Sequence, residues 1–133
     1  MNEIIKGMGF HHIALKASDF DKSLVFYKSL GLTEKVSWGE GDGRAVMLDM
    51  GDGGCIELFA GGEQCENNDM RFFHLALRAD DVDFAYQTAL NNGAKPKTPP
   101  VTVSPEGASR TLTMRIAFVY GPDGEELEFF KEM

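Results

Sequence analysis

The sequence predicts an α+β fold built from two copies of one strand–helix–strand–strand–strand unit, because two patterns recur along the chain. Residues 12–21 and 74–83 match at a constant offset of 62, including the histidine that begins each stretch. Residues 53–59 and 124–130 match at an offset of 71, where a turn glycine stands four residues before a glutamate with apolar neighbours. The chain of 133 residues is expected to be a single domain. Its two modules are expected at about 1–65 and 66–133.

The first module opens with a strand and a helix. Residues 10–17 have a mostly apolar face and no helical periodicity, which is typical of a strand. Ser18 predicts the start of a helix as its N-cap, with Asp21 in the first turn. Gly31 predicts the end of this helix, since glycine readily adopts the left-handed conformation of a C-cap. The apolar residues of the helix recur at helical spacing: Phe20, Leu24, Tyr27 and Leu30.

Three strands separated by glycine-rich turns complete the first module. They are expected at about residues 33–38, 44–50 and 54–60, with turns at 39–43 and 51–54. Residues 39–43 alternate glycine with acidic residues, but no Gly-Lys-Ser/Thr follows them. A hairpin turn is therefore favoured there over a phosphate-binding loop.

The second module repeats this order. A strand carries His74, and Gly93 predicts the end of the following helix. The apolar residues of that helix are Val82, Tyr86, Ala89 and Leu90. Strands are expected at about 94–103, 111–120 and 125–131, with a strong turn at 121–124. Four prolines predict a loop or an edge strand early in this region: Pro96, Pro99, Pro100 and Pro105.

Composition excludes several classes of partner. The chain has 13 Lys and Arg against 21 Asp and Glu, so its net charge is -8. This balance argues against nucleic acid or an anionic membrane as the main partner, because both require clustered cations. The two cysteines, Cys55 and Cys65, are ten residues apart, which suits neither a CxxC redox pair nor a zinc knuckle. We therefore expect a reduced, cytoplasmic protein.

Strand alternation brings one histidine and one glutamate of each module to the face opposite the apolar side chains. These residues are His12, Glu57, His74 and Glu128. A lone strand histidine is more often a hydrogen-bonded structural residue, and an isolated glutamate is usually solvated. Four such residues at repeat-equivalent positions favour a divalent metal site instead, since imidazole and carboxylate together suit Ni, Co, Zn or Fe. His11 points to the other face, so we interpret it as structural.

Weaker candidates share the face of the predicted ligands. Lys16 and Arg78 follow the histidines by two pleats and could bind a substrate carboxylate, although a surface role is equally compatible. Cys55 has the parity of Glu57, but a small core residue is the favoured interpretation. Three aromatic residues could line a pocket or simply pack: Trp38, Phe59 and Phe130.

Two stretches of the sequence resemble a known superfamily. Residues 12–27 with 30–32 resemble the opening of the vicinal oxygen chelate proteins, which include glyoxalases, bleomycin-resistance proteins and extradiol dioxygenases. Residues 116–119, 121–124 and 127–129 resemble the closing motif of glyoxalase I, or lactoylglutathione lyase. The resemblance implies a cupped mixed sheet around a metal site, with helices on the outer face. It also implies a homodimer and the ligand set His12, Glu57, His74 and Glu128.

The complete ligand set resembles glyoxalase I within that superfamily, because extradiol dioxygenases use only two histidines and one glutamate. The implied reaction converts the hemithioacetal of methylglyoxal and glutathione into S-lactoylglutathione through an enediolate. One divalent metal per site, Ni, Co, Zn or Mn, would stabilise the developing charge. Glu128, with Glu57 as its counterpart, would move the proton between adjacent carbons.

The chain departs from glyoxalase I where that enzyme holds glutathione. Residues 58–62 lack the asparagine that commonly follows the second ligand, and Lys16 replaces the usual first-strand arginine. Arg71 could serve as the arginine before the third ligand, although its register is shifted by one residue. Two alternatives therefore stay open: a related epimerase, isomerase or lyase for another small oxygenated substrate, and a non-catalytic bleomycin-resistance-type binding protein. Whether the ligands come from one chain or two also stays open.

Overall fold

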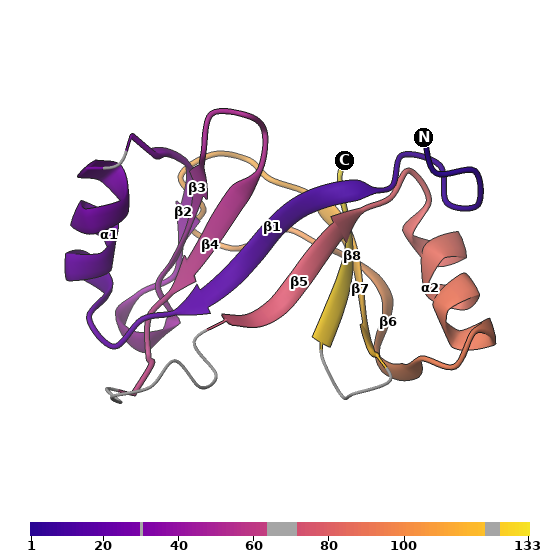
Figure 1. The fold of residues 1–133 in the computed structure, drawn as a ribbon. Coiled ribbons are helices and arrows are strands. Elements are labelled where there is room, and N and C mark those ends of the chain that lie inside the picture. Colours follow the sequence, from indigo (N-terminus) through magenta and orange to yellow (C-terminus); the bar gives the residue numbers. More distant parts are fainter. Residues whose placement is uncertain (30, 64–71, 122–125) are drawn as a thin grey trace. The chain divides into compact units, whose positions relative to one another are not determined.

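The computed structural model describes residues 1–29, 31–63, 72–121 and 126–133. Their secondary structure is α+β, as the sequence predicts (Figure 1). The first half contains β1 (Gly9–Lys16), α1 (Phe20–Ser29), β2 (Thr33–Trp38), a 3₁₀ turn (Gly41–Gly43), β3 (Ala45–Asp49) and β4 (Cys55–Phe59). The second half contains β5 (Phe72–Arg78), α2 (Val82–Asn91), β6 (Lys95–Val103), β7 (Met114–Tyr120) and β8 (Glu126–Glu132). No helix among the described residues is long and apolar enough to cross a membrane.

The chain divides into two compact units. The first unit comprises His12–Phe73 and Pro105–Thr111, and the second comprises Met1–His11, His74–Ser104 and Leu112–Met133. Two short segments thus pack with the unit that their place in the sequence would not suggest, namely the first 11 residues and the stretch 105–111. The single domain with modules at 1–65 and 66–133 stays a prediction.

In the first unit, four strands are ordered β2-β3-β4-β1. β1 runs parallel to β4, with His12 opposite Cys55 and Lys16 opposite Phe59, while the other neighbours are antiparallel. α1 covers one face of these strands (Figure 1). The core beneath the helix is formed mainly by Leu15, Phe20, Val46, Leu48 and Leu58. Ile and Leu side chains thus lie on the helix side, as the alternation predicts.

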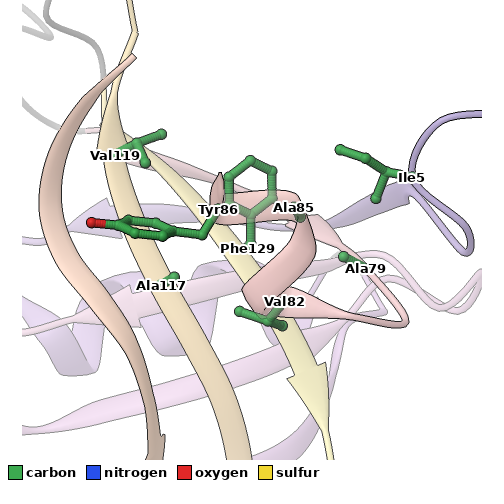
Figure 2. Packing of buried hydrophobic residues seen from close by; sticks show 8 residues of the cluster. All are labelled: Ile5, Ala79, Val82, Ala85, Tyr86, Ala117, Val119 and Phe129. Carbon is green, nitrogen blue, oxygen red and sulfur yellow. The ribbon is translucent and has the colours of Figure 1, made fainter. Parts of the chain in front are cut away.

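In the second unit, the order β5-β8-β7-β6 repeats that arrangement. β5 runs parallel to β8, and β8, β7 and β6 are antiparallel. Figure 2 shows α2 packed through Val82, Ala85 and Tyr86. The remaining buried residues of this core are Ile5, Ala79, Ala117, Val119 and Phe129. Ile5 shows how the chain's first residues contribute to the core of the second unit.

An aspartate directly precedes each helix and caps its first turn. The Asp81 carboxylate accepts a hydrogen bond from the Phe84 N–H at 2.9 Å, and the Asp19 carboxylate accepts one from the Lys22 N–H at 3.0 Å. Asp19, not Ser18, therefore caps α1, which corrects the sequence-based expectation. The two aspartates are related by the offset of 62, so the internal repeat contained the signal that local cap preference missed.

The edge strands also follow from the sequence. β6 contains Pro96, Pro99 and Pro100 and pairs within the second unit with β7 alone, as expected for a strand that cannot donate at those residues. β7 begins at Met114, three residues later than the predicted start at 111. Part of the reason is that the preceding segment bonds to β2 instead. Ser109 donates its N–H to the Ser37 carbonyl at 2.7 Å, and its Oγ accepts the Ser37 N–H at 2.8 Å.

The turn between β2 and β3 is a hairpin connection, as predicted, because the two strands pair antiparallel with Trp38 opposite Ala45. Gly39 has φ +78, and a Cβ placed there would lie 2.0 Å from the Gly43 carbonyl oxygen. Only glycine fits this close approach. The predicted turn at 121–124 falls largely outside the described residues, as does the predicted helix residue at position 30.

Candidate metal centre

The first unit holds a buried histidine–glutamate pair on its two parallel strands. His12 lies on β1 and Glu57 on β4, where the pairing of Ala14 with Glu57 brings both side chains to one face. His12 Nε2 and Glu57 Oε2 are 3.5 Å apart. His12 is 0% exposed and Glu57 is 6% exposed. Two titratable groups are therefore held together away from water.

The second unit holds the equivalent pair in the same way. His74 lies on β5 and Glu128 on β8, and Ala76 pairs with Glu128 as Ala14 pairs with Glu57. His74 Nε2 and Glu128 Oε2 are 3.1 Å apart. Both residues are again buried. The four predicted ligands thus form two pairs, one in each unit.

The donor chemistry of each pair fits a divalent metal ion. In both pairs the imidazole presents Nε2 to a carboxylate oxygen. Burying such groups is costly unless a proton or a metal ion balances the carboxylate charge. An imidazole nitrogen that faces a buried carboxylate oxygen also suits a borderline metal ion, because both atoms are ligands that such ions accept. His12, Glu57, His74 and Glu128 are therefore the residues that could hold a metal.

The side chains next to the two glutamates differ. Met47 lies opposite Glu57, and Phe118 lies opposite Glu128. The Phe118 ring contacts His74 edge-on, with centroids 5.4 Å apart and planes at 81°. Neither Phe118 nor Met47 was predicted to lie beside the site. The offset of 71 that relates the glutamates also relates these two residues, so the repeat contained this signal.

The predicted substrate-binding residues Lys16 and Arg78 lie in different units. Lys16 is exposed in the first unit, and its Nζ lies 6.0 Å from the centroid of the Phe73 ring. Arg78 is exposed in the second unit, where its guanidinium packs so close to Gly9 that a Cβ there would meet Nη2 at 2.8 Å. Arg71 lies outside the described residues.

His11 and Cys55 are both buried. His11 is 5% exposed and packs against the Phe130 ring, with centroids 4.1 Å apart. Its Nε2 lies 3.7 Å from a Glu132 carboxylate oxygen. Cys55 is fully buried, and its Sγ lies 3.9 Å from the Gly53 carbonyl oxygen. Cys65 lies outside the described part of the chain.

Comparison with known proteins agrees with this architecture. The sequence model of the Glyoxalase/Bleomycin resistance protein/Dioxygenase superfamily matches residues 9–129. The chain belongs to this superfamily, whose members are mostly metal-dependent enzymes. The resemblance seen in the sequence is thereby confirmed at the level of the superfamily.

Three individual proteins show the similarity at low sequence identity. The chain is 28% identical over 125 residues to YwbC, an uncharacterized protein of Bacillus subtilis (strain 168), covering 90% of this chain and 94% of YwbC. The crystal structure of hypothetical protein BH1468 from Bacillus halodurans C-125 is similar with a TM-score of 0.72 and 20% identity, covering 96% of both chains. The Mn(II)-bound glyoxalase from Novosphingobium aromaticivorans has a TM-score of 0.66 and 20% identity over 91% of this chain and 38% of its own. These structural similarities show the fold.

Proposed function

We propose that the protein is a metal-dependent lyase of the glyoxalase I type, which converts the methylglyoxal–glutathione hemithioacetal into S-lactoylglutathione. The observation that carries this proposal is the buried histidine–glutamate pair repeated in both units, with Nε2–Oε2 distances of 3.5 Å and 3.1 Å. Together His12, Glu57, His74 and Glu128 bind one divalent ion, Ni, Co, Zn or Mn. The four ligands come from one chain or from two chains of a homodimer. The role is cytoplasmic methylglyoxal detoxification.

A bound divalent ion supplies charge stabilisation for the substrate oxygens. The protein moves the proton. In the hemithioacetal, the carbon that carries sulfur and hydroxyl loses its hydrogen to the Glu128 carboxylate. The same proton is returned to the adjacent carbon, which was the ketone carbon, while the hydroxyl proton passes from the first oxygen to the second. The product is a thioester with a secondary alcohol. Glu57 is the counterpart on the other side of this exchange. The burial of both carboxylates excludes water that would compete for the proton.

One observation favours a second candidate function, a related isomerase, epimerase or lyase for another small oxygenated substrate. Gly61 and Gly62 follow Ala60 where glyoxalase I commonly has an asparagine for glutathione. The Gly62 N–H donates to the Ala17 carbonyl at 2.9 Å, and a Cβ at Gly62 would lie 2.8 Å from the Lys16 carbonyl oxygen. Gly62 therefore has no room for a side chain, and Gly61 carries none, so this stretch offers glutathione no side-chain amide.

The proposed function is tested by elemental analysis of protein purified without chelator or histidine tag. Apo protein is then supplied with Ni, Co, Mn or Zn and assayed with the hemithioacetal. We expect one ion per set of four ligands and turnover that depends on the metal. Metal binding without turnover would favour the second candidate function. Protein that binds no metal tightly would favour a non-catalytic binding protein of the bleomycin-resistance type.

A variant of the proton-moving carboxylate sharpens this test. Glu128→Gln keeps a ligand oxygen but removes the base, so turnover is expected to fall by about 100-fold or more. The matched control is Glu106→Gln, which removes an exposed carboxylate and should leave turnover unchanged. Sedimentation of the wild-type protein with and without metal shows whether a dimer forms. Equal turnover of Glu128→Gln and wild type would refute the role of Glu128.

A further inference from the structure

A row of aromatic and cationic side chains lies next to the His12–Glu57 pair in the first unit. Lys16 pairs with Phe59, Phe59 with Ala45, and Ala45 with Trp38, so these residues form one row across four strands. Phe59 follows Glu57 by two residues on β4 and therefore lies on the same face, about 7 Å along the strand. A substrate bound at the pair would extend over this row.

The aromatic rings of the row form a connected cluster. The Trp38 and Phe59 rings meet edge-to-face, with centroids 6.3 Å apart and planes at 81°. Phe59 meets Phe73 in the same manner at 5.2 Å and 71°. All three rings are partly exposed. Ala45 lies between Phe59 and Trp38 in the row. Its small side chain therefore separates two large aromatic side chains.

The cation of the row remains available to a ligand. Lys16 is exposed, and its Nζ lies 6.0 Å from the centroid of the Phe73 ring. Within the described ranges, Lys16 makes no salt bridge, whereas other cations of the first unit do, such as Arg44 with Asp21 at 3.0 Å. An ammonium beside partly exposed rings suits a carboxylate attached to a planar apolar group.

We propose that Lys16, Trp38, Phe59 and Phe73 form the binding site for the body of the substrate, which is a planar apolar group bearing a carboxylate. This inference rests on the proposed function in one respect, because it assumes that the substrate oxygens bind at the His12–Glu57 pair. It favours the second candidate function, since the peptide of glutathione has no planar apolar group to contact the rings. The Lys16 ammonium binds the carboxylate, and the ring edges and faces contact the apolar body.

The test uses the fluorescence of Trp38, which is the single tryptophan of the chain. Full-length protein, both metal-free and metal-loaded, is titrated with 3-phenylpropionate, with its uncharged analogue 3-phenylpropionamide, and with S-methylglutathione. We expect the acid to bind about tenfold more tightly than the amide, because a charge-assisted hydrogen bond adds to the same apolar contact. S-methylglutathione is expected to bind more weakly than the acid. Equal affinity for the acid and the amide would overturn the proposal.

Three variants assign the contributions of the row, and a fourth serves as control. Lys16→Met keeps the apolar stem and should abolish the preference for the acid, while Lys16→Arg should restore most of it. Phe59→Leu should weaken the acid and the amide alike, several-fold, because it removes ring contact but not charge. Lys22→Met removes an exposed cation of α1 in the same unit, away from the row, and should retain wild-type affinities. A Lys16→Met variant that keeps the tenfold preference contradicts the proposal.

The outcomes separate this inference from the proposed function. Metal content and isomerase turnover are measured on the same preparations, and thermal unfolding verifies that each variant is folded. A protein that binds metal and isomerises the hemithioacetal, but shows no Lys16-dependent preference, refutes the inference alone. A protein that shows the preference but binds no metal refutes the proposed function alone.

Discussion

The two units share the arrangement of strands and of the histidine–glutamate pair, but they differ in the side chains beside that pair. Each carries a buried histidine–glutamate pair on parallel strands, related by the offsets of 62 and 71. The rows beside the pairs diverge, because Phe59 is partly exposed while its equivalent Phe130 is 1% exposed and packed against His11. His11 lies in the segment 1–11, which belongs to the second unit. The two units thus keep equivalent histidine–glutamate pairs, while the row beside the pair is covered in the second unit and partly exposed in the first.

A second duplicated feature joins helix to sheet in each unit. Arg44 pairs with Asp21 at 3.0 Å in the first unit, and Arg115 pairs with Asp83 through two contacts of 2.9 Å and 2.7 Å in the second. The same two offsets relate these residues. Arg44 also lies over the Phe20 ring, with 4.2 Å from Cζ to the centroid. The ion pair of the second unit is therefore bidentate, because Arg115 donates to both carboxylate oxygens of Asp83.

The largest expected effect tests whether the two histidine–glutamate pairs contribute equally to the proposed metal site. His12→Ala and His74→Ala should each lower metal-dependent turnover by at least about 100-fold. Removing a residue that only orients a metal ligand costs up to about 100-fold in activity, and removing the ligand itself should cost more. Elemental analysis should show loss of the metal in both variants. If one variant keeps its metal and turnover, the two pairs do not share one site.

Core substitutions compare the stability of the two units. Leu58→Ala in the first unit and Phe129→Ala in the second both remove buried side chains that pack beneath a helix. We expect losses of about 2–5 kcal/mol for the leucine and about 3–5 kcal/mol for the phenylalanine in the free energy of unfolding. Urea denaturation followed by circular dichroism measures both. A single transition that shifts in both variants would show that the units unfold together, and two transitions that shift separately would show that they do not.

The helix caps should respond alike in the two units. Asp19→Ala and Asp81→Ala each remove a carboxylate that accepts a hydrogen bond from an N–H of the first helical turn. Each change is expected to cost about 1 kcal/mol of unfolding free energy, and replacement by Asn should recover most of it. Loss in one variant only would contradict the equivalence that the repeat predicts.

The smallest expected effect concerns the ion pair of the second unit. The hydrogen bonds and charge of Arg115 lower the pKa of Asp83 below its usual value of 3.8. A lowered carboxyl pKa in the folded state adds stability above the unfolded value, and this stability is lost as the pH falls through the folded value. Because Asp83 is exposed, solvent screening keeps the effect small. Asp83→Asn should therefore slightly reduce the difference in thermal unfolding temperature between neutral pH and pH 3. An unchanged difference would indicate that the pair adds no stability.

Much of the fold could be predicted from local patterns. The order of strands and helices, the hairpin turn before β3 and the edge position of β6 follow from periodicity, glycine and proline, since each rule acts over a few residues. The histidines and glutamates were identified because the repeat and strand alternation act together. Phe73 was missed, because nothing near it in the sequence indicates that its ring meets Phe59.

The sequence by itself determined which residues share a face and which positions are equivalent, because side-chain alternation and the two offsets are properties of the chain alone. Only the tertiary structure decided which segments pack together. Residues 1–11 join the second unit and residues 105–111 cover the edge of β2 in the first, where Arg110 also donates to the Lys35 carbonyl at 3.3 Å. The physical reason is that these contacts join residues far apart along the chain. Their stability depends on buried area and free hydrogen-bonding groups that exist only once the sheets have formed.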